Sequence, residues 1–167
     1  ADCVADAAAS PLHPAHYEIR LFGPEDQAPA CAADRKQSAT GLPVRFMGTS
    51  PAARMREVLD EMDVLVIPSR WYENSPLVLL NALASHTPVV VSDVAGMTEF
   101  VGEGAQGFAF ARANPMALAE VLHRIDEGRD KLRALSTTTR YDVTTLAMTA
   151  QTLEVYSEVA SRSRRVF

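Results

Sequence analysis

The segment "PSRWYENSPLVLLNALA", residues 68–84, decides the fold. The apolar run "DVLVIP" (63–68) ends at its start, and a helical run begins a few residues later. A short, continuously apolar run followed by a helix is typical of a parallel sheet whose two faces are both covered. A carboxylate, Glu73, stands just before the predicted helix start, where the helix dipole attracts anions, so its presence there needs an explanation.

The same alternation runs through most of the chain. Strands are predicted at 17–23, 44–48, 63–68, 88–92 and 107–111, and helices at 51–62, 77–85, 116–128, 131–139 and 143–162. Helix starts are indicated by Ser50-Pro51, Asn74-Ser75-Pro76 and Asn114-Pro115. The sequence therefore predicts an α/β fold: a Rossmann-like, doubly wound parallel sheet with flanking helices and a helical C-terminus. We expect one domain over residues 1–167.

The composition excludes several classes of protein. With 47% hydrophobic and 22% charged residues, the chain is typical of a soluble globular domain. A net charge of -5 argues against a nucleic-acid partner. The apolar runs are too short to cross a bilayer and the Ala-rich start lacks a basic region, so we expect no transmembrane segment and a cytoplasmic location. Cys3 and Cys31 have no neighbouring ligands at metal-binding spacing and are interpreted as ordinary thiols.

The run "GEGAQG", residues 102–107, matches the Gly-x-Gly-x-x-Gly pattern of dinucleotide-binding folds. In those folds the glycines connect a strand to the helix that follows it. Here they follow a helical run and precede a predicted strand. We therefore expect a tight turn and reject the nicotinamide-dependent oxidoreductase that the pattern would otherwise suggest.

The predicted helix start after residue 73 has the properties of an anion site. If Asn74 or Ser75 caps the helix and Pro76 is its first residue, the backbone N–H groups of Leu77, Val78 and Leu79 point out of its N-terminus, where they can hold a phosphate. Glu73 would then accept hydrogen bonds from neighbouring hydroxyls, which indicates the sugar of a nucleotide-sugar. The alternative, a capping or surface acid, remains equally open on the local sequence.

The run from Asp63 to Leu122, which contains "PSRWYENSP", "PVVVSDVAGMTE" and "GFAFA", resembles the donor-binding domain of retaining GT-B glycosyltransferases of family four. The resemblance covers roughly residues 17–128. It implies that Glu73 contacts the sugar of the donor in the active site and that Asn74, Ser75, Leu77 and Val78 surround the diphosphate. It also implies that Met47 and Gly48 meet the nucleobase and that Glu99 braces the turn near Gly96. Arg70 is a candidate phosphate contact, and no metal or cofactor is implied.

Two features depart from the family pattern. The acid that the family places eight residues after Glu73, where it binds ribose, is replaced by Asn81, and a neutral bond there should weaken nucleotide binding by about 1 kcal/mol. The family's first strand, which carries an Arg and a Lys, is not found either. It would lie centrally, between the strands at 17–23 and 63–68. The sequence leaves open three explanations for this central position: an upstream segment fills it, another chain fills it through strand exchange or dimerisation, or the sheet is rearranged.

The resemblance implies a cytoplasmic retaining glycosyltransferase that transfers a hexosyl group from a nucleoside diphosphate sugar. An N-terminal acceptor domain is expected outside this sequence, so the isolated chain should bind the donor weakly and be inactive. The alternative is a non-catalytic nucleotide-sugar-binding or interaction module with a degenerate site. We expect Trp71 and Tyr72 to close the strand end against the core, with stacking on a base or sugar as the alternative, and His86 to be a turn histidine.

Overall fold

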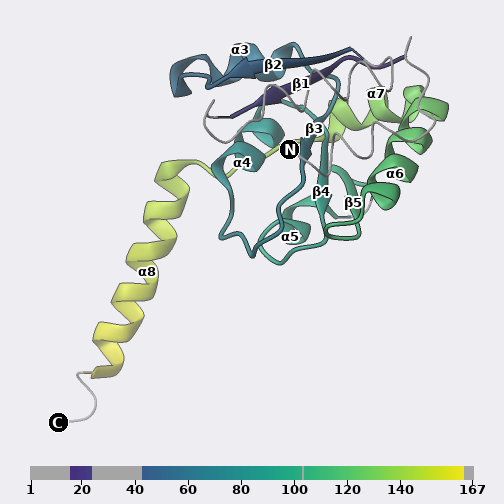
Figure 1. Ribbon diagram of the computed structural model, residues 1–167. Coiled ribbons are helices and arrows are strands. Elements are labelled where there is room, and N and C mark those ends of the chain that lie inside the picture. Colours follow the sequence, from purple (N-terminus) through teal and green to yellow (C-terminus); the bar gives the residue numbers. More distant parts are fainter. Residues whose placement is uncertain (1–15, 24–42, 103, 164–167) are drawn as a thin grey trace.

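The structure is a computed structural model that describes residues 16–23, 43–102 and 104–163 (Figure 1). The expectations for Cys3 and Cys31 lie outside the described residues.

The strands form where the sequence predicts them. The described strands are β1 (Ile19–Phe22), β2 (Val44–Gly48), β3 (Leu65–Ile67), β4 (Val89–Ser92) and β5 (Gly107–Phe110). All the pairings between them are parallel. Every residue of β4 is buried, as expected for a strand covered on both faces. The prediction of a parallel α/β sheet is confirmed.

Helices follow the strands in alternation. The described helices are η2 (Ala52–Arg54), α3 (Met55–Asp60), α4 (Leu77–Ala84), α5 (Thr98–Val101), α6 (Pro115–Glu127), α7 (Arg129–Thr138) and α8 (Thr145–Ser163). The predicted start of α6 is confirmed, because Oδ1 of Asn114 accepts hydrogen bonds from the N–H groups of Met116 and Ala117, each at 3.1 Å. Gly128 is the C-cap of α6. In the described part of the chain, no helix is long and apolar enough to cross a membrane.

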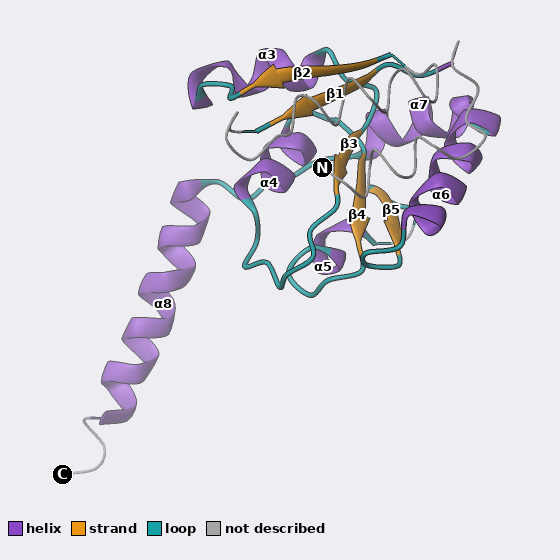
Figure 2. Ribbon diagram, viewed as in Figure 1, coloured by secondary structure: helices purple, strands orange, loops and turns teal. Residues whose placement is uncertain are grey.

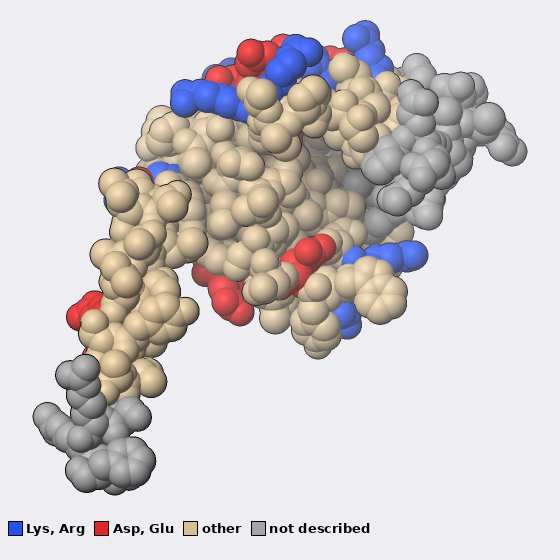
Figure 3. All heavy atoms as spheres, turned by 90° about the vertical axis from the view of Figure 1, so that its left-hand side faces the viewer, with Lys and Arg blue, Asp and Glu red and all other residues tan. Residues whose placement is uncertain are grey.

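α8 stands apart from the rest of the molecule. It extends away from the sheets as a separate limb (Figure 1), and the space-filling view shows the same separation (Figure 3). Residues 145–162 are all exposed, and they include large apolar side chains such as Leu146, Leu153 and Tyr156. The predicted C-terminal helix is confirmed, and it contributes nothing to the core described below.

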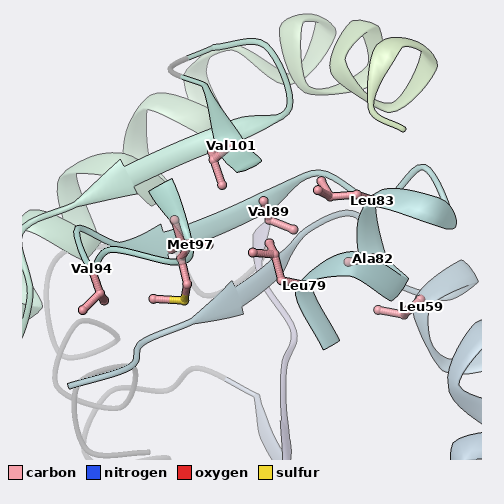
Figure 4. Close-up of a cluster of buried hydrophobic side chains, with 9 residues drawn as sticks. Leu59, Leu79, Ala82, Leu83, Val89, Val94, Met97 and Val101 are labelled. Atoms are coloured by element: carbon pink, nitrogen blue, oxygen red, sulfur yellow. The ribbon is translucent and has the colours of Figure 1, made fainter. Parts of the chain in front are cut away.

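Two apolar clusters cover the two faces of the sheets. On one face, Leu118, Val121, Leu122 and Ile125 of α6 pack with strand residues that include Val90. On the other, α3, α4 and the segment around α5 pack onto β4 (Figure 4). A fully buried Leu or Val contributes about 1.5–3 kcal/mol, so these clusters fix the helices on the strands.

The sheet is interrupted between β1 and β3. β1 and β2 form a two-stranded sheet, and β3, β4 and β5 form a three-stranded sheet in that order (Figure 2). Tyr17, Ile19 and Leu21 nevertheless pack against the same cluster as Val64 and Val66, so the two sheets share one core. Of the three solutions left open by the sequence, pairing of β1 with β3 in a rearranged sheet is not found among the described strands.

In the glycine-rich run, the described residues 102 and 104–106 lie in turns. Gly102 and Gly104 have φ of 44° and 76°, and the run leads from α5 into β5. The order is therefore helix, turn, strand, as the sequence predicts, and the run lacks the strand-to-helix geometry of a dinucleotide site.

Replacing the N-cap of α6 should destabilise the fold. Asn114→Ala removes the acceptor for two backbone N–H groups and should cost about 1 kcal/mol. For a domain of this size that lowers Tm by about 2–4 °C. Asn114→Asp keeps the acceptor and is the control, so thermal unfolding should place it near the wild type. Equal Tm values for all three proteins would show that the cap does not contribute.

Candidate functional site

The carboxyl ends of β3, β4 and β5 meet at one edge of the three-stranded sheet, because these strands are parallel. Ser69 follows β3, Asp93 follows β4 and Arg112 follows β5. Ligands of open α/β sheets bind beyond this edge. Glu73 and the start of α4 lie in the segment that leaves β3 there.

The Glu73 carboxylate is held in place by a chain of hydrogen bonds. Its Oε1 accepts a hydrogen bond from the hydroxyl of Ser69. The carbonyl of Ser69 accepts one from the hydroxyl of Ser92, at the end of β4, at 2.6 Å. Among the described residues, no side chain or backbone group donates to Oε2 of Glu73. This half-buried carboxylate is therefore fixed through one oxygen and can accept hydrogen bonds through the other.

Gly96 fixes the backbone of Glu73. A Cβ atom at residue 96 would overlap the carbonyl oxygen of Glu73, and the φ of Gly96 is 83°, where a side chain is strained. The Gly96 N–H lies 3.4 Å from Oε1 of Glu99, to which it donates. The predicted bracing role of Glu99 near Gly96 is confirmed, and the two loops pack without a side chain between them.

The start of α4 differs from the prediction. α4 begins at Leu77 and Pro76 is the N-cap residue, so Pro76 is not the first helical residue. Neither Asn74 nor Ser75 caps the helix, because no side-chain cap bond is formed and Ser75 adopts a positive φ of 54°. Ser75 therefore has a left-handed backbone conformation directly before Pro76.

Two backbone N–H groups remain available at this helix start. The N–H of Leu79 donates to the carbonyl of Pro76 at 2.9 Å, so the prediction that it points out of the helix is wrong. Among the described residues, the N–H groups of Leu77 and Val78 donate to no acceptor. They carry the positive end of the helix dipole a few residues beyond Glu73.

The remaining predicted residues occupy different positions. Asn81 is exposed on α4, one turn after Leu77 and on the same face. Arg70 and Asn74 are exposed between β3 and α4. Met47 and Gly48 end β2, which belongs to the other sheet, and among the described residues no hydrogen bond joins them to Glu73 or α4.

The prediction that Trp71 and Tyr72 close the strand end against the core is wrong. Their exposed fractions are 81% and 77%, because the loop after β3 turns both rings to the surface. The guanidinium of Arg112 lies 5.9 Å from the centre of the Tyr72 ring, a cation–π contact. The prediction for His86 is confirmed: it lies in the turn after α4, and its Nδ1 is 2.7 Å from the carbonyl of Thr139.

Three residues of this edge were missed at the level of sequence. Ser69 orients Glu73, Ser92 joins Ser69 to β4, and Arg112 brings a positive charge to the end of β5. Each lies at or within two residues of a strand end. That position relative to the predicted strands would have identified them as candidates.

The family model described as "Glycosyl transferases group 1" matches residues 1–127 of this chain. The chain belongs to this glycosyltransferase family. It is 33% identical over 92 residues to a D-inositol 3-phosphate glycosyltransferase from Nocardia farcinica, which covers 55% of this chain and 20% of the relative. It is 31% identical over 121 residues to an alpha-maltose-1-phosphate synthase from Mycolicibacterium smegmatis, covering 66% of this chain and 31% of the relative.

Two solved structures share the fold. Anabaena Alr3699/HepE in complex with UDP superposes with a TM-score of 0.77 at 23% identity, over 92% of this chain and 44% of that protein. WaaG, a glycosyltransferase involved in lipopolysaccharide biosynthesis, superposes with a TM-score of 0.72 at 21% identity, over 89% and 41%. The fold of this glycosyltransferase family member is therefore GT-B-like. The chain spans about a fifth to a third of the two curated relatives and under half of these two structures.

Adding a methyl group at Gly96 should disturb the site more than the same change at a comparable glycine. Gly96 and Gly104 both have positive φ, 83° and 76°, but only at Gly96 does a Cβ meet backbone atoms. Either alanine should lower the free energy of unfolding by about 1–2 kcal/mol, because a side chain is strained at a positive φ. Gly96→Ala must in addition displace the Glu73 carbonyl. Thermal unfolding should give the larger loss for Gly96→Ala. Equal losses would contradict the close packing of the two loops.

Proposed function

We propose that this chain is the donor-binding part of a retaining glycosyltransferase, which transfers a hexosyl group from a nucleoside diphosphate sugar to an acceptor. The observation that carries the proposal is the oriented carboxylate of Glu73 close in sequence to the N–H groups of Leu77 and Val78, which have no acceptor among the described residues. The carboxylate can accept hydrogen bonds from sugar hydroxyls, and the N–H groups can donate to a diphosphate. Family membership supports the same reading.

The donor would lie along the start of α4. Its diphosphate accepts hydrogen bonds from the N–H groups of Leu77 and Val78, beside the turn formed by Asn74 and Ser75. The sugar hydroxyls donate to Oε2 of Glu73, the atom that is free among the described residues. Asn81 extends the site along the exposed face of the helix, by about 6 Å from Leu77, toward the ribose.

Two further contacts belong to this proposal. Met47 and Gly48, at the end of β2, would meet the nucleobase, and the exposed Arg70 would reach a phosphate. Among the solved structures, one complex of Alr3699/HepE contains UDP and another contains UDP-glucose. Those contents support a nucleotide-sugar as the class of ligand for the present site.

The transfer breaks the bond between the anomeric carbon and the diphosphate oxygen and forms a bond from that carbon to the acceptor oxygen on the same face. The departing diphosphate takes the proton of the acceptor. The amides at the start of α4 stabilise the negative charge that develops on the leaving oxygen, so no metal is needed for this step. The acceptor would be bound by a separate N-terminal domain, and the isolated chain would therefore bind donor weakly without turnover.

Removing the Glu73 carboxylate should weaken donor binding. Charge-assisted hydrogen bonds contribute about 1.5–3 kcal/mol, so Glu73→Ala should reduce affinity for the matching nucleotide-sugar by more than about tenfold. Affinity for the nucleoside diphosphate alone should change much less, because Glu73 contacts the sugar. Calorimetric titration with UDP, GDP and ADP and their common sugar conjugates measures both.

Glu120→Ala is the matched control, since Glu120 is an exposed acid on α6, away from this edge. It should bind like the wild type. Unchanged affinity of Glu73→Ala for every conjugate that the wild type binds would remove Glu73 from the site.

A second candidate function is a non-catalytic nucleotide-sugar-binding or interaction module, and Asn81 is the observation that favours it. Its exposed amide replaces the charged acceptor that the resemblance places there. If the site still binds a nucleotide, Asn81→Glu should tighten binding by about 1 kcal/mol, or several-fold. The same titration decides between the two: tighter binding supports the transferase, and no change supports the degenerate module.

A further inference from the structure

The two most exposed aromatic side chains of the described residues stand together, directly before Glu73. Trp71 and Tyr72 follow β3 in consecutive positions, and both are on the surface. Tryptophan is highly buried on average in folded proteins, and exposed tryptophan and tyrosine are typical of surfaces that contact another molecule. Because the two residues lie beyond the carboxyl end of β3, that contact falls at the edge where open α/β sheets bind ligands.

The Tyr72 ring is held by the loop after β5. The N–H of Arg112 donates to Oδ1 of Asp93 at 2.7 Å, which joins this loop to the end of β4. The Arg112 guanidinium lies 5.9 Å from the centre of the Tyr72 ring. A side chain that is already fixed loses little conformational freedom when it binds a ligand, so this contact prepares the ring for binding.

Hydrogen-bonding groups lie at the same edge as the rings. In the described part of the chain nothing donates to Oδ2 of Asp93, and the guanidinium groups of Arg70 and Arg112 form no ion pair with a carboxylate. The edge therefore combines flat apolar surfaces with charged donors and acceptors. A hexopyranose has the matching chemistry, because its C–H groups form an apolar face and its hydroxyl groups surround that face.

An anionic lipid surface and a nucleobase fit this edge less well. Anionic lipids attract clusters of basic residues, but Glu73 follows β3 and Asp93 and Glu99 follow β4, so the same edge carries negative charge. A nucleobase would stack on an aromatic ring. The proposed donor, however, runs from its sugar at Glu73 to its ribose at Asn81, so its base lies at the end remote from Trp71.

The acceptor belongs on the sugar side of the donor. Transfer joins the acceptor oxygen to the anomeric carbon, so the acceptor must approach the sugar that Glu73 contacts. Trp71 and Tyr72 directly precede Glu73 in the chain. We propose that these two aromatic residues form an acceptor subsite, on which a hexopyranose ring of a saccharide acceptor stacks while Asp93 and Arg112 bind its hydroxyl groups.

This chain then binds part of the acceptor itself, in addition to the separate N-terminal domain of the proposed function. The identification of the saccharide as the acceptor rests on that proposed function. The binding of a saccharide to the two rings rests only on the aromatic and polar groups of this edge, and it can be measured without a nucleotide.

Tryptophan fluorescence tests the subsite directly, because Trp71 is the only tryptophan of the chain. The chain is titrated with the methyl glycosides of glucose, mannose, galactose and glucuronic acid up to tens of millimolar. At least one glycoside should change the emission in a saturable way and protect the indole from quenching by acrylamide, because it covers the ring. No saturable change with any glycoside would overturn the proposal and assign the rings to a contact with another protein surface.

Variants identify the contribution of each ring, with affinity for the same glycoside measured by ligand-detected NMR. Trp71→Ala and Tyr72→Ala should each weaken binding by at least about fivefold, whereas Trp71→Phe keeps an aromatic face and should retain most of the affinity. Tyr156→Ala is the matched control, because Tyr156 is an exposed tyrosine on α8, and it should bind like the wild type. Unchanged affinity in both Trp71→Ala and Tyr72→Ala would contradict the proposal.

Titration of Trp71→Ala with nucleotides separates the acceptor from the donor. Its affinity for the nucleoside diphosphate and for the sugar conjugate should equal that of the wild type. Weaker binding of the nucleoside diphosphate would place Trp71 at the base, and weaker binding of the sugar conjugate alone would place it at the donor sugar. Either result overturns the proposal. If the wild type binds a glycoside at Trp71 but no nucleotide, the saccharide site is supported and the proposed function fails.

Discussion

The close contact between the α-carbon of Gly96 and the carbonyl of Glu73 is the constraint on which the candidate site depends. It joins the loop after β4 to the loop after β3 at a distance that no side chain permits. Glu99 holds the Gly96 N–H from one side, and Ser69 holds the Glu73 carboxylate from the other. The backbone and the side chain of Glu73 are therefore fixed by different strands of the sheet.

This arrangement places an acid and a helix start next to each other without bringing them into conflict. Leu79, which is fully buried, packs with Met97 and Val94 beneath the loops and fixes the beginning of α4 (Figure 4). The Glu73 carboxylate bonds to Ser69 instead of capping α4, so the N–H groups of Leu77 and Val78 stay available. A ligand with hydroxyls at one end and phosphates at the other satisfies both groups, which explains why an acid precedes this helix.

Much of the fold follows from the sequence because its strands are buried on both faces. Runs such as "PVVVS" are continuously apolar, and Asn114-Pro115 and Gly128 mark the ends of α6, so these elements are encoded locally. The interruption between β1 and β3 was anticipated from the strand order, and the sequence left open three explanations of how it is resolved. The position of Glu73 before a helix was also predictable, because it depends on the boundary between one strand and one helix.

The finer geometry of the site depends on contacts between distant segments, and there the sequence was insufficient. Asn74 or Ser75 was expected to cap α4, but Ser75 adopts a positive φ in the loop that packs against Gly96. Trp71 and Tyr72 suggested burial by their apolar character, yet the direction of the loop after β3 exposes them. Ser69 was overlooked because its role arises only when residues 69, 73 and 92 come together.

The central claim is that the loop containing Glu73 and the start of α4 form a nucleotide-sugar site. The most direct test is an NMR titration of this chain with millimolar nucleoside diphosphates and their sugar conjugates. The account predicts that one nucleoside diphosphate shifts the amide signals of Leu77 and Val78, and that its sugar conjugate also shifts those of the segment from Ser69 to Glu73. Saturable binding of a nucleotide-sugar that shifts signals elsewhere and leaves these residues unchanged would contradict it.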